Sequence, residues 1–255
     1  MKEFTLRRNL DLKKITKKIK SDGMVEIDNF LDEDTVKKLQ NYIFEEINNQ
    51  PKGYMGCVGK KNLKGSPLEN IDSEYGIESI LESLLPQISG NKIKDKKLYQ
   101  VLRVLYGENQ GLKKAYKFHY DAYALTALLP IVIPERKDGM NGDFLYLMQR
   151  RKLHQNFLRN VIEKFIIQNS ITKFLLSKNF IRKKLNFKVC RLKPGKLYIF
   201  CGFQTIHGNS SCSPNSPRAT VLFHYADPFS DNIFFKLVER LNILRVDLKR
   251  KIAID

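Results

Sequence analysis

The second half of the chain is divided into short apolar runs, and this division limits the folds that the chain can adopt. From Lys97 onward, runs rich in Val, Ile, Leu, Tyr and Phe alternate with turn residues such as Gly, Pro, Asn and Asp. Runs of this length and composition are typical of strands in a barrel or a sandwich. The predicted strands are LYQVLRVLYG, YKFHYDAY, ALTALLPIVI, NGDFLYLM, FKVCRLK, GKLYIFCG and ATVLFHYAD. The sequence therefore predicts a mainly β fold.

The N-terminal part carries helical patterns instead. Residues 2–20 alternate Leu and Ile with Lys and Arg and stop at a Ser-Asp-Gly turn, which predicts a short basic helix. After the strand-like run MVEIDNF, Asp32 or Asp34 is expected to cap a second helix, whose apolar residues recur at helical spacing. Residues 50–75 are rich in Gly and Pro and predict a long irregular segment, and residues 77–85 predict a further helix.

One segment interrupts the series of strands. Residues 152–185 lack Gly and Pro and repeat apolar side chains at helical spacing, which predicts one or two inserted helices. Residues 150–184 contain ten Lys or Arg and a single acidic residue, Glu163. We expect the insert to cover the barrel with its charged side outward; a lid, a membrane-surface patch and a docking face for an acidic carrier remain alternatives. Residues 232–252 predict a terminal helix.

Length and composition predict one domain over residues 1–255, with the insert 152–185 inside it, because 42% hydrophobic content suffices for one sizeable core. No apolar run reaches the ~18 residues of a membrane span, and the N-terminus lacks the apolar core of a signal peptide. A cytoplasmic location is therefore expected. The four cysteines form no CxxC pair, which favours reduced thiols over disulfides or a structural zinc site.

The net charge of +18 suggests contact with an acidic partner, such as nucleic acid, an anionic membrane surface or an anionic substrate. The chain is also rich in Asn and Ile beside Lys, a bias that an AT-rich genome gives to all its proteins, so a solvated basic surface is the favoured interpretation. The basic stretches lack the interleaved aromatic residues that stack on bases, and nucleic acid is not the favoured partner.

Two of the four histidines lie in settings that suggest metal ligation. In Phe118-His119-Tyr120-Asp121, the His and the Asp are two residues apart, so on an extended strand they point to the same face. His207 follows the apolar run LYIFCGF, where a strand end would deliver a second imidazole. Two His and one carboxylate on one face of an octahedron are associated with non-haem iron(II) oxygenases.

Arg218 is a candidate anion-binding residue at the start of the run ATVLFHY, eleven residues after His207. Arg218 and Thr220 share one strand face and would meet a carboxylate through a charge-assisted contact. An ordinary surface Arg is the alternative, but the preceding Pro turn and the following apolar strand favour burial. His224 has the same strand parity and is expected to be packed or hydrogen-bonded rather than a metal ligand.

The order of these motifs resembles the 2-oxoglutarate/Fe(II) dioxygenase superfamily, and most closely its phytanoyl-CoA and prolyl hydroxylase branches. The order is HxD, Leu-Thr-Ala-Leu-Leu-Pro, Asn-Gly-Asp-Phe-Leu, Lys-Pro-Gly-Lys-Leu-Tyr-Ile-Phe, a distal His and Arg-x-Thr. The opening DGMVEIDNFLDEDTVKKL is similar to the N-terminal lead of those branches, so the resemblance covers about residues 21–228.

The resemblance implies a double-stranded β-helix, a cupin-like jelly roll, with an N-terminal helical region, a helical insert and helices on its outer face. It also implies Fe(II), 2-oxoglutarate as co-substrate, dioxygen, and hydroxylation of a small amino-acid-like or acyl substrate with release of succinate and CO2. The retained Asp121 favours hydroxylation or another oxidation over halogenation. The residues that the resemblance implies are the iron ligands His119, Asp121 and His207 and the cofactor-binding residues Arg218, Thr220 and Thr126.

Four other functions remain open. The enzyme alternatives are a protein side-chain hydroxylase, a zinc hydrolase that uses the same three ligands, and a nucleic-acid demethylase of the alkylation-repair type. Such demethylases usually carry two arginines after the distal His, whereas only Arg218 lies between His207 and Asp227. The non-enzyme alternative is an inactive barrel that acts as a binding protein. The favoured substrate is a small molecule, for which an anionic or carrier-bound form is one option, but no residue identifies it.

Overall fold

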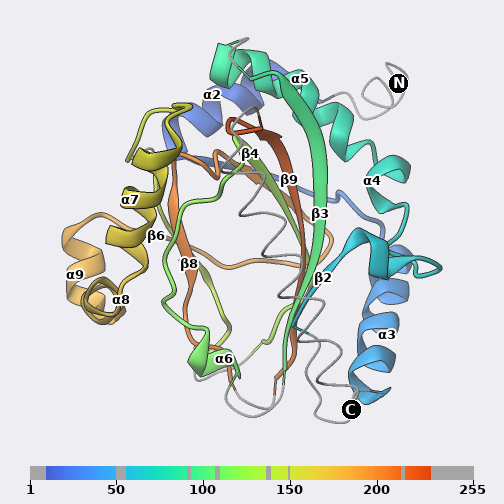
Figure 1. The fold of residues 1–255 in the computed structure, drawn as a ribbon. Helices are drawn as coiled ribbons and strands as arrows, with labels where there is room; N and C mark the ends of the chain where they lie inside the picture. Colours follow the sequence, from blue (N-terminus) through green and yellow to red (C-terminus); the bar gives the residue numbers. More distant parts are fainter. Residues whose placement is uncertain are drawn as a thin grey trace.

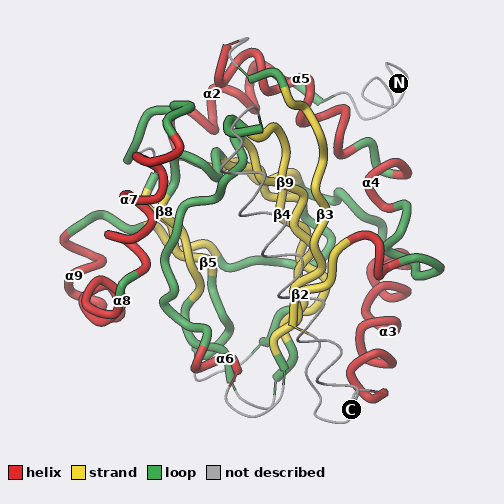
Figure 2. The backbone as a smooth tube through the Cα atoms, in the orientation of Figure 1, coloured by secondary structure: helices red, strands yellow, loops and turns green. Residues whose placement is uncertain are grey.

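Two antiparallel sheets form the centre of the molecule. The computed structural model describes residues 10–49, 56–90, 93–106, 110–135, 139–148, 150–213 and 216–230. Its strands are β1 (Met24–Ile27), β2 (Gly56–Gly59), β3 (Asp95–Leu105), β4 (Leu125–Val132), β5 (Phe144–Leu147), β6 (Lys188–Cys190), β7 (Leu197–Phe200), β8 (Ile206–Asn209) and β9 (Arg218–Asp227). The larger sheet has the order β1-β7-β4-β9-β3-β2 and the smaller one β6-β5-β8. The sheets lie opposite each other with helices outside them (Figures 1 and 2), so the jelly-roll expectation is confirmed.

The N-terminal helices cover the outer face of the larger sheet (Figure 1). These helices are α2 (Leu12–Asp22), α3 (Glu33–Asn49), α4 (Ile71–Glu74) and α5 (Ile77–Ser89), with a 3-10 turn at Lys60–Leu63. A short helix, α6 (Gln110–Lys113), lies apart from them at the lower end of the view in Figure 1. Gly23 ends α2 in the left-handed conformation, as the predicted turn requires. Asp32 Oδ1 accepts a 2.7 Å hydrogen bond from the Thr35 amide and caps α3. Of the two predicted candidates, Asp32 and Asp34, Asp32 is therefore the cap.

Two local predictions are wrong. The described part of residues 50–75 contains β2, the 3-10 turn and α4, because β2 finds a pairing partner in β3 that the local sequence does not reveal.

The run YKFHYDAY is no strand: its only ladder contact is an isolated bridge between His119 and His207. Tyr116, at its start, has a positive φ of 54°, and the Asp121 amide bonds to the Gly202 carbonyl. The segment thus bonds at one point to β8 and at another to Gly202, which follows β7, and does not pair along a single strand.

The insert lies beside the smaller sheet as three helices, where one or two were predicted (Figure 1). They are α7 (Phe157–Gln168), α8 (Ser170–Ser177) and α9 (Asn179–Lys184), and the side chains of Asn156 and Asn169 cap the first two. The expected orientation is also wrong, because many apolar side chains of the insert are exposed and polar Asn160 is buried. Helical periodicity identifies two faces but not which of them packs inward.

Two further expectations concern the ends of the chain and the membrane. Residues 1–9, which begin the basic N-terminal pattern, and the predicted terminal helix at 232–252 lie outside the described residues. Within the described residues, no helix combines the length and the apolar character that crossing a bilayer requires.

Candidate metal centre and its cavity

The structure brings the three predicted metal ligands together. His119 and His207 face each other across the isolated bridge. The His119 amide donates to the His207 carbonyl at 2.9 Å, and the His207 amide donates to the His119 carbonyl at 3.0 Å. Their Nε2 atoms lie 3.8 and 3.4 Å from Asp121 Oδ1. One potential ligand atom from each of the three residues lies within 4.8 Å of the others. The HxD segment supplies two of the three candidate ligands and β8 the third.

The hydrogen bonds of the two imidazoles involve their Nδ1 atoms and leave their Nε2 atoms available for a metal. His119 Nδ1 lies 3.0 Å from the Lys117 carbonyl oxygen, and His207 Nδ1 lies 3.0 Å from that of Thr205. Because a carbonyl only accepts, each Nδ1 carries the hydrogen and each Nε2 of a neutral ring carries the lone pair. Burial lowers the pKa of His119 to about 3, which keeps its ring neutral. Three electron-pair donors therefore converge, and this donor set fits Fe(II).

Asp121 is held by neighbours other than the two imidazoles. Thr126 Oγ1 donates a 2.6 Å hydrogen bond to Asp121 Oδ2 and lies 3.1 Å from His224 Nδ1. Burial alone would raise the pKa of Asp121, but His207 and His224 hold it well below its usual value, so the carboxylate is ionised. Gly202 contacts Asp121 so closely that a Cβ there would collide with Oδ2. Gly202 was not predicted from the sequence, because this approach depends on the tertiary fold.

Arg218 is a buried cation in the same cavity as the metal-ligand candidates. Its side chain is 1% exposed, and the inner cavity is lined by Arg218, Thr220 and the three candidate metal ligands, among others. Arg218 Nε donates to the Gly142 carbonyl at 3.1 Å, but the guanidinium forms no ion pair with any residue that the structure describes. Burial lowers its pKa to about 10, so it stays positive at neutral pH. An unpaired buried cation is costly, and the arrangement therefore favours an anion from outside the chain.

The remaining predicted residues occupy distinct places. Thr220 is buried and lines the inner cavity beside Arg218. Thr126 is buried against Asp121 and does not line that cavity, so its contact is with a ligand candidate. His224 lines the cavity and is hydrogen-bonded to Thr126, which is the environment expected for it.

A larger outer cavity of about 740 Å³ adjoins the inner one. Both are lined by Arg103, His119, Leu222 and His224, and the outer one extends to α8 through Lys173. Arg103 lies on β3 directly opposite Thr220 of β9. Sequence reasoning missed Arg103 because strand pairing, which the sequence does not display, brings it to the site.

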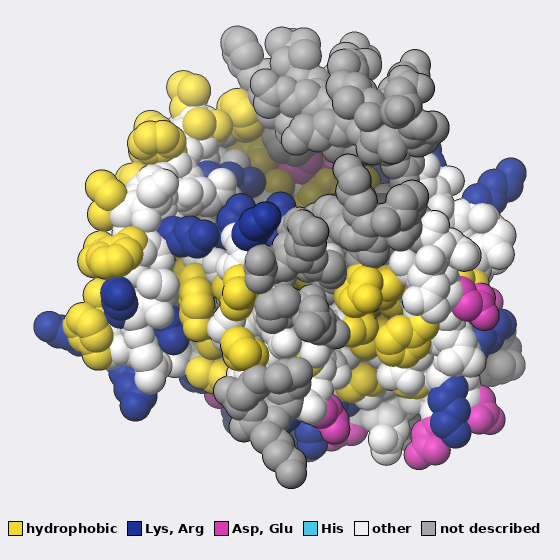
Figure 3. Space-filling model, turned by 90° about the horizontal axis from the view of Figure 1, so that it is seen from below, with side chains coloured by type: hydrophobic (Ala, Val, Ile, Leu, Met, Phe, Trp, Pro, Cys, Tyr) yellow, Lys and Arg dark blue, Asp and Glu magenta, His cyan; other side chains and the backbone are white. Residues whose placement is uncertain are grey.

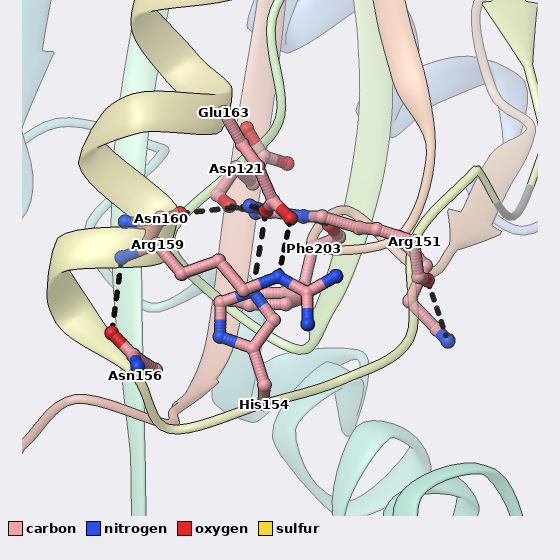
Figure 4. Close-up of polar contacts among 9 residues, drawn as sticks. Asp121, Arg151, His154, Asn156, Arg159, Asn160, Glu163 and Phe203 are labelled. Carbon is pink, nitrogen blue, oxygen red and sulfur yellow. Dashed lines mark hydrogen bonds and ion pairs between the residues drawn. The ribbon is translucent and has the colours of Figure 1, made fainter.

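Arg151 joins the insert to the metal centre (Figure 4). Its guanidinium lies between the rings of Tyr120 and Phe203, 4.1 and 3.8 Å from their centroids. Nη1 donates to Glu163 of α7 at 2.6 Å, and Nη2 reaches the Asp121 carbonyl at 3.4 Å. Burial would raise the pKa of Glu163, but hydrogen bonds led by that from Arg151 lower it to about 2. The only acidic residue of the insert is therefore used to fix α7 to the site, a role that the sequence did not indicate.

Comparison with known proteins identifies the fold. No family model and no curated protein sequence matches the chain. Among solved structures, the non-haem α-ketoglutarate-dependent epimerase SnoN from nogalamycin biosynthesis matches with a TM-score of 0.58 and 15% identity, covering 85% of this chain and 83% of that one. A Trichoplax adhaerens prolyl hydroxylase, solved with a hypoxia-inducible factor peptide, matches with a TM-score of 0.53 and 12% identity over 88% of this chain and 93% of its own.

The nogalamycin carbocyclase SnoK, also non-haem and α-ketoglutarate-dependent, gives a TM-score of 0.52 and 15% identity over 86% and 85% of the two chains. These identities are low, and the likeness is one of architecture. The protein has the fold of the 2-oxoglutarate-dependent non-haem oxygenases.

Proposed function

We propose that the protein is an Fe(II)- and 2-oxoglutarate-dependent oxygenase that acts on a small molecule. The observation that carries the proposal is the shared cavity, in which two imidazoles and a carboxylate converge beside buried Arg218, which has no acidic partner among the described residues. A zinc hydrolase would use the same three ligands, but its reaction requires no anionic co-substrate for Arg218 to bind. The fold shared with 2-oxoglutarate-dependent enzymes supports the same reaction class.

In this function, His119, Asp121 and His207 would hold Fe(II), which when bound supplies the redox chemistry that couples dioxygen to the decarboxylation of 2-oxoglutarate. Arg218 would bind the distal carboxylate of 2-oxoglutarate, and the Thr220 hydroxyl would add a hydrogen bond. The Thr126 hydrogen bond would keep Asp121 Oδ2 in place, which leaves Oδ1 toward the imidazoles.

The apolar part of the inner cavity would exclude water from the reaction. Leu128, Phe144, Phe200 and Leu222 line it together with the polar residues. A dry surrounding strengthens the pairing of Arg218 with a carboxylate, because the effective dielectric constant falls. The prime substrate would occupy the outer cavity, whose volume of about 740 Å³ lies within the range of small-molecule sites and whose wall includes His119. Succinate formation that requires both Fe(II) and 2-oxoglutarate tests this function.

A further inference from the structure

The outer cavity contains cations without acidic partners. Arg103, Lys114, Lys117 and Lys173 line it, and its lining includes no Asp or Glu among the described residues. None of the four forms an ion pair with a residue that the structure describes. Such a cluster attracts an anion into the cavity.

We propose that the outer cavity binds an anionic group of the prime substrate, a carboxylate or a phosphate. This inference rests on the proposed function, because it assigns the cavity to the substrate. His119 lies on the wall of the same cavity, so a molecule held by the lysines at its anionic end has its other end near the metal centre. Arg218 lines only the inner cavity and stays available for 2-oxoglutarate.

Binding of simple aromatic probes to the metal-free protein tests this proposal without any turnover. Phenyl phosphate and benzoate are expected to bind, and benzamide, their neutral counterpart, is expected to bind at least ~10-fold more weakly, about 1.4 kcal/mol. The preferred anion distinguishes a phosphate from a carboxylate substrate. The double variant Lys117→Gln/Lys173→Gln should lose at least ~10-fold in affinity for the anions, measured by calorimetry.

The matched control is Lys178→Gln/Lys184→Gln, which removes two insert charges outside the cavity lining and should bind as the wild type does. Equal affinity for benzamide and benzoate, or an unchanged affinity in the cavity variant, would overturn the proposal. Because no iron is present, either outcome is independent of whether the protein is an oxygenase.

A different observation concerns the outer surface of the insert. Fourteen large hydrophobic side chains are exposed among the described residues, and eleven of them lie between residues 158 and 189. The most exposed are Phe165 at 75%, Ile171 at 73%, Leu158 at 72% and Phe180 at 70%. Figure 3 shows apolar side chains gathered along one edge of the molecule. A concentration of this kind marks an interaction surface, whereas scattered apolar residues do not.

The same insert is strongly basic. It carries eight Lys or Arg between residues 152 and 185, and its only acidic residue, Glu163, is already bound by Arg151, Arg159 and His154. Lys178, Lys183 and Lys184 belong to the segment around α9, close in sequence to exposed Phe174 and Phe180. The surface thus offers apolar side chains and uncompensated positive charge together.

We infer that the insert docks on an anionic membrane surface. Helices with exposed Phe, Leu and Ile beside Lys and Arg place their apolar side chains at the headgroup boundary, and their cations pair with lipid phosphates. A membrane suits this surface better than a second copy, because two copies would bring two basic surfaces together. Ile167, Gln168, Ser170 and Lys173 of α7 and α8 also line the outer cavity, so docking would bring that cavity close to the lipid.

Vesicle flotation with the full chain tests the docking. The protein is expected to float with vesicles of phosphatidylcholine and phosphatidylserine, and less with phosphatidylcholine alone or at high salt, which screens exposed charges. The triple variant Phe165→Ser/Phe174→Ser/Phe180→Ser should lose at least ~10-fold in binding, because it removes most of the apolar insertion. The charge variant Lys178→Glu/Lys183→Glu/Lys184→Glu should lose the preference for phosphatidylserine. Arg182 is left unchanged because it donates to the Leu176 and Ser177 carbonyls.

Phe44→Ser provides the control, since Phe44 is a 43% exposed residue of α3, outside the insert. It should float like the wild type, and circular dichroism should show that every variant is folded. Equal flotation of the wild type and the phenylalanine variant would overturn the inference. A wild-type dimer in light scattering that the triple variant abolishes, without vesicle binding, would assign the surface to a second copy instead.

Discussion

Replacing His207 with Ala is expected to remove iron from the purified protein and, with it, all 2-oxoglutarate turnover. The substitution deletes one of three donors, and two remaining ligands hold a metal far more weakly, so we expect iron occupancy below about a tenth of the wild-type value. His119→Ala should behave in the same way. The fold should persist, because neither ring belongs to the apolar clusters that hold the two sheets, although the His207 ring packs against Phe144 and Phe200.

The measurement is the iron content after reconstitution, beside the circular dichroism of each variant. His154→Gln is the matched control, because His154 contacts Glu163 and is not part of the three-residue cluster. That variant should bind iron as the wild type does. Full iron occupancy in His207→Ala or His119→Ala would refute the ligand assignment.

The second large effect is expected at Arg218. Arg218→Ala should raise the KM for 2-oxoglutarate by ~10² or more. The substitution removes a charge-assisted contact of ~3 kcal/mol, and each ~1.4 kcal/mol corresponds to a ten-fold change in affinity. Burial lowers the pKa of Arg218 only to about 10, so the wild-type contact should be insensitive to pH between 6 and 8. Steady-state turnover at varied 2-oxoglutarate measures the effect.

Arg218→Lys should give an intermediate KM, because it keeps the charge and loses the planar fork that binds a carboxylate through two nitrogens. Iron content should remain at the wild-type level in both variants, which separates a lost co-substrate contact from a damaged metal site. An unchanged KM in Arg218→Ala would assign the carboxylate to another cation, with Arg103 as the next residue to test, since it lines the same inner cavity.

The parts of the site that the sequence predicts are those that follow from local periodicity. Arg218 and Thr220 share a face of β9 because they are two residues apart. The same spacing predicts that His119 and Asp121 lie together, which they do although their segment is not a strand. The prediction of His207 as the third metal ligand rests instead on the order of the motifs along the chain. All five of these side chains line one cavity in the structure.

The parts that could not be predicted depend on pairing between distant segments. Arg103 reaches the site because β3 pairs with β9, and no local feature of β3 records that register. Gly202 matters because Asp121 packs against it. The predicted orientation of the insert is wrong for a similar reason. The polar network around Arg151 and Glu163 draws polar side chains of α7 inward, and apolar side chains remain outside.

The most direct test of the account is succinate formation from 2-oxoglutarate by the purified protein. We expect slow succinate release without any prime substrate when Fe(II), 2-oxoglutarate and dioxygen are all present, and none when any one of the three is left out. Replacing Fe(II) with Zn²⁺ should also abolish it, because zinc has no redox chemistry. The absence of succinate in the complete mixture, with iron bound at full occupancy, would contradict the proposed function.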